Sequence, residues 1–389
     1  MIQSILDNDL YKFTMQQAVH MLYPRVDVEY VFINRSHTPF PKGFAEKLQI
    51  EVDKMPSFRL TQEEKEYLDR TCYFMTPVYL DFLEHYTFDP NEVSISQDNS
   101  DLKVTIKGPW YRTILWEVPL MAIISELYFV MTNARPLPDE QIKEINLNKA
   151  RILSQNNIKY ADFGTRRRFS SSGHEGLIRD ILALENNTLI GTSNVNLARQ
   201  FKITPIGTMA HEWIMFHGVL NGYRMANPTA VESWAAVFHG HLGIALTDTF
   251  TTEIFLSTFD TLHAKLFDGV RHDSGDPIAF IDRVVEHYEK LHVDPITKTI
   301  VFSDGLDIEK AVHIHKHCVG RIRDSYGIGT NLTNDVGVTP LNMVIKLAKC
   351  RTAPDKEWHN AIKLSDDLGK HTGDSEELAH CINVLERGI

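Results

Sequence analysis

The chain has 389 residues, of which 43% are hydrophobic and 23% are charged, and its formal net charge is −11. This composition is typical of a folded globular protein, and the acidic balance argues against nonspecific nucleic-acid binding, which requires a basic surface. The length predicts two domains, and the four scattered cysteines predict reduced thiols rather than a cysteine metal site.

The N-terminal third of the chain alternates helical and strand patterns. Asp7, Asn8 and Asp9 form a cluster of capping residues at the start of a helical apolar pattern that contains Tyr11. A strand, two helices, a hairpin and an apolar helix are then expected, in this order, over residues 26–34, 61–71, 79–86, 93–106 and 112–131. These elements predict a small α+β domain over residues 1–130.

Strands that end in small or charged polar residues recur through the next part of the chain. Six segments follow this pattern, namely residues 161–168, 189–194, 203–213, 270–276, 300–305 and 326–330. Helical patterns lie among them at residues 197–202, 253–267, 278–291 and 308–318. Repeated strand–helix units predict an irregular α/β barrel over residues 131–340, with the strand ends facing one site.

The last segment, residues 341–389, changes pattern. Two hairpin-like strands are expected at residues 343–347 and 360–365, and we expect this segment to join the N-terminal domain. The predicted fold class is therefore α/β, an irregular β/α barrel plus a smaller α+β domain formed by the N- and C-terminal segments. No leader pattern and no uncharged apolar run near ~20 residues is visible, so we expect a cytoplasmic protein with no membrane partner and no nucleic-acid partner.

Arginines and glycines at the predicted strand ends indicate an anionic ligand. Arg166 belongs to a run of three arginines at one strand end, and Arg271 follows another. Guanidinium groups bind carboxylates and phosphates through paired N–H donors, although a solvated, ion-paired turn is the alternative for the run. Residues 327–330 can offer backbone amides and a hydroxyl group to a phosphate, although an ordinary tight turn has the same composition.

Carboxylates also follow the predicted strands. Asp273 and Asp304 are candidate ligands for a Mg²⁺ ion that bridges a diphosphate, because Mg²⁺ prefers few carboxylates together with phosphate and water. Asp276 stands before a proline, which favours a helix cap as the alternative for that residue.

His211 is the candidate nucleophile. It follows a Gly-Thr turn and is flanked by Glu212, and a neighbouring carboxylate can fix the imidazole tautomer and raise its nucleophilicity. Zinc is the competing interpretation, since His239, His241 and His272 are also present. However, no histidine stands at position 215, where an HExxH motif would place its second ligand.

Several of these motifs together resemble the nicotinate phosphoribosyltransferase family. The motifs are Asp162-Phe163-Gly164-Thr165-Arg166-Arg167, Gly191-Thr192-Ser193-Asn194, Gly207-Thr208-Met209-Ala210-His211-Glu212, Asp273-Ser274-Gly275-Asp276 and Gly327-Ile328-Gly329-Thr330. The segments Asp7-Asn8-Asp9-Leu10-Tyr11-Lys12 and Trp116-Glu117-Val118-Pro119-Leu120 are also similar to the family, so the resemblance spans nearly the whole chain.

The resemblance implies a two-domain type II phosphoribosyltransferase acting in NAD salvage. The implied reaction joins nicotinate to 5-phosphoribosyl 1-diphosphate, giving nicotinate mononucleotide and diphosphate, with coupled ATP hydrolysis, Mg²⁺ and a homodimer. By the same resemblance His211 is phosphorylated by ATP, Tyr11 frames the pyridine ring, Thr208 and Arg271 hold nicotinate, and Thr330 holds the ribose phosphate. The predicted substrate-binding residues are Tyr11, Arg166, Ser193, Asn194, Thr208, Arg271, Asp273, Ser274, Asp304, Gly305, Gly327, Gly329 and Thr330.

Two positions bear on substrate choice and on departures from the family. The nicotinamide-specific relative carries an acid where Ser193 stands, and a serine suits a carboxylate ligand because it does not repel it. We therefore expect nicotinate rather than nicotinamide. His272 stands where family members often carry an aliphatic residue, and its side chain is expected to point out of the barrel mouth.

Other functions remain open on the sequence. One is a phosphoribosyltransferase that uses nicotinamide or quinolinate. Another is a catalytically silent phosphate-binding barrel that senses a metabolite, and a third is a barrel hydrolase using Asp273 and Asp304.

Overall fold

The computed structural model of the chain describes residues 1–386. Two compact units are present: unit 1 comprises residues 1–207 and 328–347, and unit 2 comprises residues 208–327 and 348 onward. These units divide the chain at points other than residues 130 and 340. The domain boundaries expected from the sequence, at residues 130 and 340, remain a prediction.

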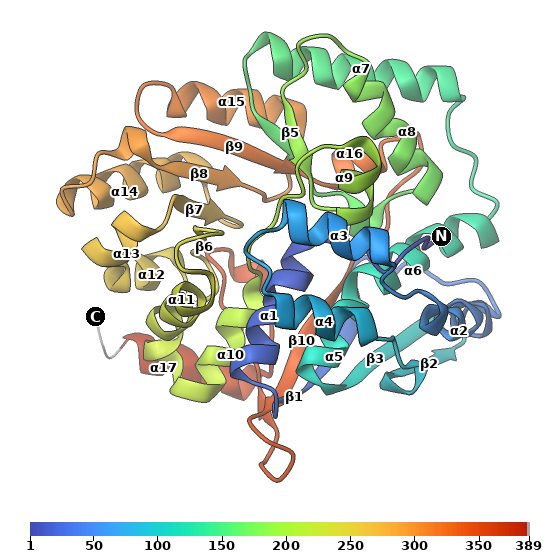
Figure 1. Ribbon diagram of the computed structural model, residues 1–389, viewed down its shortest axis with the longest axis horizontal. Helices are drawn as coiled ribbons and strands as arrows, with labels where there is room; N and C mark the ends of the chain where they lie inside the picture. Colours follow the sequence, from blue (N-terminus) through green and yellow to red (C-terminus); the bar gives the residue numbers. More distant parts are fainter. Residues whose placement is uncertain (387–389) are drawn as a thin grey trace. The chain divides into compact units, whose positions relative to one another are not determined.

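Unit 1 is built around an antiparallel sheet in which β3 pairs with β1 on one side and β2 on the other (Figure 1). The alternating burial of β3 places Leu102, Val104 and Ile106 inside, as its sequence predicts. The expected strand at residues 26–34 and the expected hairpin are confirmed.

The elements of unit 1 follow in chain order. They are α1 (Leu10–Leu22), β1 (Asp27–Asn34), α2 (Phe44–Lys54), η1 (Met55–Ser57), α3 (Gln62–Thr71), α4 (Pro77–His85), η2 (Pro90–Glu92), β2 (Val93–Asp98), β3 (Asp101–Pro109), α5 (Trp110–Thr113), η3 (Ile114–Trp116), α6 (Glu117–Met131), α7 (Asp139–Gln155), β4 (Tyr160–Asp162), η4 (Thr165–Arg167), α8 (Ser171–Leu182), β5 (Leu189–Thr192), α9 (Val195–Phe201) and α16 (Thr330–Thr333).

The apolar helix of unit 1 is a core helix. The stretch Trp110–Met131 is long and apolar enough to cross a membrane, yet 78% of its most apolar window is buried inside the protein. A helix that is apolar on all sides is expected in a protein interior as well as in a membrane. The other helices expected in this third of the chain appear as α1, α3 and α4.

Unit 2 contains a run of parallel strands, each followed by helical chain. Strand β7 pairs with β6 and β8, and β8 pairs with β9, all in parallel. Gly269 opens β7 where a Cβ atom would lie 1.8 Å from the carbonyl oxygen of Thr299, so glycine is required there for strand pairing. In Figure 1 α14 lies beside α15, next to β8.

The elements of unit 2 are α10 (His211–Asn221), α11 (Tyr223–Phe238), β6 (Ile244–Leu246), α12 (Thr252–Thr258), α13 (Thr261–Leu266), β7 (Gly269–His272), α14 (Pro277–Lys290), η5 (Pro295–Thr297), β8 (Thr299–Phe302), α15 (Ile308–Cys318), β9 (Arg323–Ile328), β11 (His359–Asn360), η6 (Leu368–Lys370) and α17 (Ser375–Glu386). Strand β10 (Met343–Arg351) begins in unit 1 and ends in unit 2.

Two of the expected strands are wrong. The segment after Ile203 forms only an isolated bridge between Thr192 and Pro205. The strand expected at residues 360–365 ends at Asn360, and beyond it Lys363 makes an isolated bridge to Thr372. Proline lacks the N–H that a ladder needs, which explains the first case.

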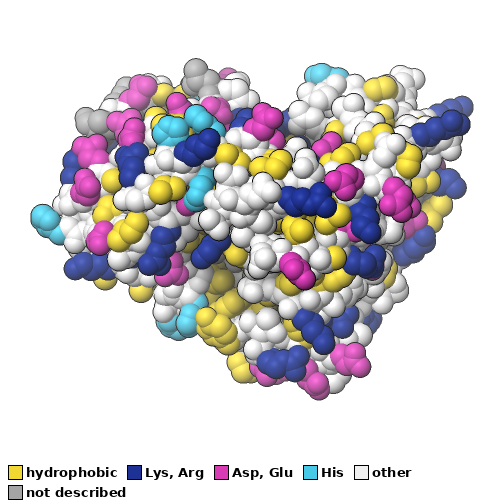
Figure 2. Space-filling view, turned by 90° about the horizontal axis from the view of Figure 1, so that it is seen from above, with side chains coloured by type: hydrophobic (Ala, Val, Ile, Leu, Met, Phe, Trp, Pro, Cys, Tyr) yellow, Lys and Arg dark blue, Asp and Glu magenta, His cyan; other side chains and the backbone are white. Residues whose placement is uncertain are grey.

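The α/β class, with a parallel sheet and a separate antiparallel sheet, is confirmed. All four cysteines are free and buried. On the face shown in Figure 2, acidic and basic side chains are interspersed.

Candidate active site

His211 is the first residue of α10, and the preceding residue, Ala210, has an extended backbone conformation. Both nitrogens of its imidazole have polar contacts. Nδ1 lies 2.9 Å from the Thr249 hydroxyl oxygen, and Nε2 lies 2.9 Å from a carboxylate oxygen of Asp273. The side chain is 19% exposed, so it is held by these contacts but still reachable.

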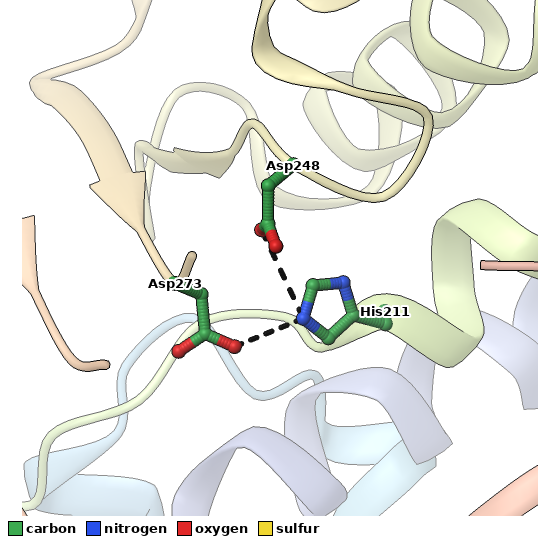
Figure 3. A group of neighbouring side chains, drawn as sticks. All are labelled: His211, Asp248 and Asp273. Atoms are coloured by element: carbon green, nitrogen blue, oxygen red, sulfur yellow. Dashed lines mark hydrogen bonds and ion pairs between the residues drawn. The ribbon is translucent and has the colours of Figure 1, made fainter. Parts of the chain in front are cut away.

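Two carboxylates face Nε2 of His211, as Figure 3 shows. Asp273 follows β7 and makes the 2.9 Å contact, and Asp248 follows β6 with its Oδ1 at 3.9 Å. Ligand atoms of these three residues all lie within 4.8 Å of one another. We call His211, Asp248 and Asp273 the histidine cluster.

Arg271 and Ser303 hold Asp273 in place. The guanidinium of Arg271 donates to Oδ1 of Asp273 at 3.1 Å and to the Ser303 hydroxyl at 2.8 Å. Ser303 donates in turn to Oδ1 of Asp273 at 2.6 Å. The ends of two neighbouring strands, β7 and β8, thus meet at one carboxylate, because parallel strands bring their carboxyl ends to one edge.

Asp248 is held from the other side. The hydroxyl of Ser274 donates to its Oδ2 at 2.6 Å, and the ammonium of Lys363 lies 3.1 Å from the same atom. Its Oδ1 is buried and has no hydrogen-bond partner among the described residues. An unused buried carboxylate oxygen directed at the histidine is an available ligand atom for a cation.

The charges around His211 oppose one another. Burial and the adjacent ammonium of Lys363 lower the pKa of His211 below its usual value, despite the carboxylates of Asp248 and Asp273. Burial alone would raise the pKa of Asp273, but Arg271 and His211 hold it well below the usual range. The cluster therefore contains a neutral imidazole and ionised carboxylates at neutral pH.

The remaining residues expected in unit 2 divide into two groups. Thr208 donates its hydroxyl to the Ile244 carbonyl at 3.2 Å, and Asp304 accepts from Lys370 at 2.6 Å. Gly305 adopts a left-handed turn with φ of +50°, and Gly327 is buried within β9. Of the two candidate Mg²⁺ ligands, Asp273 thus lies in the histidine cluster, whereas Asp304 is paired with a lysine.

Two further residues near these strand ends have structural roles. Asp276 caps α14 by accepting from the amides of Ile278 and Ala279, so the helix-cap interpretation is confirmed. His272 is 3% exposed, and its ring packs against Phe280 and Phe302, with centroids 4.9 and 5.6 Å away. The expectation that its side chain points out of the barrel mouth is therefore wrong, because the ring is packed between aromatic side chains.

A second polar network lies in unit 1, centred on Asp162 at the end of β4. This carboxylate contacts Nε2 of His174 at 2.6 Å and accepts from Thr192 at 2.6 Å and from the Gly164 amide at 2.9 Å. Burial would raise its pKa, but His174 and these donors lower it. The network fixes the turn that carries the arginine run.

The three arginines of that run have different environments. Arg168 is 1% exposed and binds Asp7, so it is structural. The Arg166 side chain is 40% exposed and donates to Glu117 at 3.2 Å, which leaves other donors of its guanidinium for a ligand. Burial, Arg166 and Arg35 lower the pKa of Arg167 to about 10.

Tyr11 lies on the first turn of α1, near the carboxylate of Glu117. Lys12 pairs with Glu117 at 2.5 Å, and its ammonium is 5.4 Å from the centre of the Tyr11 ring. Burial and Glu117 raise the pKa of the Tyr11 phenol to a value far above neutrality, so it stays protonated. Tyr11 and Arg166 are thus brought to one carboxylate, Glu117.

Four other predicted site residues also lie in unit 1. Ser193 is 3% exposed and donates its hydroxyl to Asp9 at 2.8 Å. Asn194 caps α9 through the Leu197 amide and is also buried. Gly329 precedes the short helix α16, which Thr330 opens. Ligand roles for these residues remain predictions.

Four residues around His211 were not predicted from the sequence, namely Asp248, Thr249, Ser303 and Lys363. Asp248 and Thr249 follow β6, which has the expected pattern of an apolar strand that ends in polar residues but is only three residues long. Ser303 lies within the motif that supplied Asp304. Lys363 carries no local signal, because its partner His211 is 152 positions away.

Comparison with known proteins identifies the family of the chain. Residues 6–125 match the nicotinate phosphoribosyltransferase (NAPRTase) N-terminal domain, and residues 158–388 match the nicotinate phosphoribosyltransferase (NAPRTase) family. The chain belongs to the nicotinate phosphoribosyltransferase family. The family expected from the sequence motifs is therefore confirmed.

Relatives of this family match the chain over its whole length. It is 88% identical over 389 residues to a nicotinate phosphoribosyltransferase of Desulforapulum autotrophicum, with 100% of both chains covered. It is also similar to the crystal structure of nicotinate phosphoribosyltransferase from Porphyromonas gingivalis, with 45% identity, a TM-score of 0.97 and 100% of each chain covered. The Vibrio cholerae nicotinate phosphoribosyltransferase structure gives 35% identity and a TM-score of 0.93, covering 99% of this chain and 94% of that one.

Proposed function

We propose that the protein forms nicotinate mononucleotide and diphosphate from nicotinate and 5-phosphoribosyl 1-diphosphate, with coupled hydrolysis of ATP. The observation that carries the transferase reaction is the full-length similarity to relatives named nicotinate phosphoribosyltransferase. The proposal includes a homodimer, which rests on the family resemblance, and a cytoplasmic location.

The transferase reaction requires little acid–base chemistry. The pyridine nitrogen of nicotinate is already a nucleophile, and it forms a bond to C1 of the ribose as the C1–oxygen bond to diphosphate breaks. Positive charge grows on the sugar while the departing diphosphate takes the electron pair. Arginine guanidinium groups at the strand ends would favour this step by stabilising the developing negative charge, and holding the reactants in line lowers the barrier further.

His211 is the proposed acceptor of the γ-phosphoryl group of ATP. Its pKa is lowered by burial and by Lys363, so the ring is neutral and carries a nucleophilic lone pair at neutral pH. The ring stands at the start of α10, where the helix dipole favours an added negative charge. A phosphoryl group there would add about −1.5 to −2 charges, by analogy with other phosphorylated side chains.

Mg²⁺ is the proposed cofactor, and the residues present suit it. Asp248 and Asp273 offer carboxylate oxygens, the ligands that Mg²⁺ prefers, and Oδ1 of Asp248 is buried without a hydrogen-bond partner among the described residues. Bound there with substrate phosphates, the ion would neutralise charge on the phosphate oxygens. Asp304, the other ligand expected from the sequence, is paired with Lys370.

The test separates the two halves of the proposal. Purified protein is assayed with nicotinate, nicotinamide and quinolinate, and diphosphate release is measured with and without ATP. We expect turnover with nicotinate that ATP stimulates. Diphosphate release that does not depend on any pyridine would instead indicate a hydrolase.

The phosphohistidine is tested with ATP labelled at the γ-phosphate. We expect acid-labile label on the wild type and none on His211→Ala, with loss of the ATP stimulation in the variant. Full ATP-stimulated turnover by His211→Ala would refute the role of this residue. His239→Ala, at an exposed left-handed position beyond α11, is the matched control.

A further inference from the structure

Lys363 places a positive charge directly at the reactive atom of His211. Its ammonium lies 2.8 Å from Nε2 of His211 and 3.1 Å from Oδ2 of Asp248. The side chain is only 8% exposed. Burying a lysine is costly unless its charge is used, so a lysine in this position requires an explanation.

The backbone around Lys363 is fixed. Its amide donates to the Thr372 carbonyl at 2.9 Å, and its carbonyl accepts from the Thr372 amide at 2.8 Å. The next residue, Leu364, donates to the carbonyl of Thr249, and the hydroxyl of Thr249 contacts Nδ1 of His211. Thr249 therefore connects the C-terminal segment to the histidine, which sets the approach of Lys363.

Ser365 provides a second sign that this segment is constrained. It adopts a left-handed backbone with φ of +67°, which a non-glycine residue rarely does. The following residue, Asp366, accepts from the hydroxyl and amide of Thr252 at 2.6 and 2.8 Å. Contacts on both sides of Ser365 thus hold the segment in a conformation it would otherwise avoid.

The two contacts at Nε2 require different tautomers of a neutral ring. Nε2 either donates a proton to Asp273 or accepts one from Lys363. An ammonium has protons to donate and no lone pair, so contact with Lys363 requires the ring proton to be on Nδ1, facing Thr249. In that tautomer Nε2 carries the lone pair needed for nucleophilic attack.

The charges around Nε2 of His211 also indicate a role for Lys363. Asp248 and Asp273 contribute two negative charges, and Arg271 and Lys363 contribute two positive ones. A phosphoryl group on Nε2 adds about −1.5 to −2 charges next to the two carboxylates. Arg271 already donates to Asp273 and Ser303, whereas the ammonium of Lys363 lies at Nε2 itself.

We propose that Lys363 is a positioning residue that presents Nε2 of His211 as the phosphoryl acceptor and then neutralises the phosphoryl group bound there. This inference rests on the proposed ATP-coupled function. The Nε2 lone pair forms a bond to the γ-phosphorus, and the bond from that phosphorus to the β,γ-bridging oxygen breaks, so ADP leaves with the electron pair. Lys363 stays protonated, and its hydrogen bond passes from Nε2 to a phosphoryl oxygen.

Hydrolysis then restores the starting state. Water attacks the phosphorus, the phosphorus–nitrogen bond breaks, and the electron pair returns to Nε2 as inorganic phosphate leaves. The ammonium of Lys363 again donates to Nε2.

The experiment compares full-length variants under γ-labelled ATP and Mg²⁺. Lys363→Met keeps the length of the side chain without charge, and Lys363→Arg keeps the charge. Lys356→Met is the matched control, because Lys356 lies in the same C-terminal part of the chain and its side chain is 62% exposed. For each protein the rate of acid-labile labelling, kcat with ATP and KM for nicotinate are measured.

We expect Lys363→Met to label about 10- to 100-fold more slowly, the effect of one charge-assisted hydrogen bond. Its kcat with ATP should fall in parallel, while KM for nicotinate changes less than about twofold, because the lost interaction acts at His211. Lys363→Arg should recover much of the labelling rate, and Lys356→Met should label like the wild type.

Equal labelling of the wild type and Lys363→Met would overturn the inference and leave the ATP-coupled function standing. Labelling by Lys363→Arg that is no faster than that by Lys363→Met would overturn it too, because charge would not be the cause. A wild type that takes no label on His211 would instead remove the proposed ATP coupling. If Lys363→Met unfolds, Lys363→Gln takes its place in the same comparison.

Discussion

Arg168 binds Asp7 through two hydrogen bonds of 2.8 Å, although the two residues lie 161 positions apart in the sequence. Both side chains are almost fully buried. Asn194 adds a third contact by donating to the same carboxylate at 2.7 Å. The pair joins the start of the chain to the turn that carries Arg166.

Removing one member of this pair should destabilise the protein strongly. Asp7→Asn or Arg168→Met leaves a buried charge or donor without its partner, so each should lower the free energy of unfolding by about 3–5 kcal/mol. The measurement is urea-induced unfolding at neutral pH. The double variant Asp7→Asn/Arg168→Met should cost less than the sum, and strict additivity would show that the two side chains do not interact.

His217 predicts a pH dependence of stability. It is fully buried in α10, and burial lowers its pKa from 6.5 to about 4. Between pH 6.5 and pH 4 the His217 imidazole is protonated in the unfolded chain but neutral in the folded protein. The contribution of neutral His217 to the free energy of unfolding is therefore fully present above pH 6.5 and is lost as the pH falls toward 4. The loss should be on the order of 3 kcal/mol.

The variant that tests this is His217→Gln, which keeps a polar side chain but does not titrate in this range. Urea unfolding from pH 7 to pH 4.5 should give a shallower loss of stability for His217→Gln than for the wild type. Parallel pH profiles for the two proteins would assign the effect to other groups.

Ser193 predicts a change in substrate binding. Its hydroxyl donates to Asp9, so Ser193→Asp would place two carboxylates side by side in a buried position. A second anion there should repel the carboxylate of nicotinate, and KM for nicotinate should rise about tenfold. Ser193→Ala is the control, since it removes the hydroxyl without adding charge. An unchanged KM for nicotinate in Ser193→Asp would contradict this argument.

Two glycines form a matched pair for stability. A Cβ atom at Gly269 would lie 1.8 Å from the Thr299 carbonyl oxygen, whereas one at Gly176 would meet nothing within 4 Å. Gly269→Ala should therefore force the β7–β8 pairing apart and lower the melting temperature. Gly176→Ala, inside α8, should raise stability by about 0.5–1 kcal/mol, because alanine favours a helix. Equal melting temperatures for the two variants would argue against the close strand approach.

Local pattern was sufficient for much of the fold. The alternation in β3 and the strand patterns at β7 and β8 predicted strands that the structure contains, and the segment expected at residues 326–330 overlaps the end of β9. Strand β6 was missed because three residues, Ile244–Leu246, are too few to show a period. Asp248 was missed with it, since the expectation of a functional carboxylate depended on recognising the strand before it.

The lysine beside the histidine cluster could not be predicted from local sequence. The approach of Lys363 to His211 is set by hydrogen bonds to Thr249 and Thr372, made by backbone groups that every residue type except proline possesses. The same holds for the arginine run, in which nothing near Arg168 distinguishes it from Arg166. The difference depends on Asp7, which lies far away in sequence.

The place of Lys363 in the chain has a consequence for biosynthesis. Once synthesis has passed Asp273, the imidazole and both carboxylates of the histidine cluster are present. The ammonium that contacts His211 and Asp248 belongs to Lys363, 152 positions beyond the histidine. The nascent polypeptide can thus assemble β6, β7, β8 and β9 before that cation exists. On the proposed role of Lys363, His211 would become able to accept a phosphoryl group only near the end of synthesis.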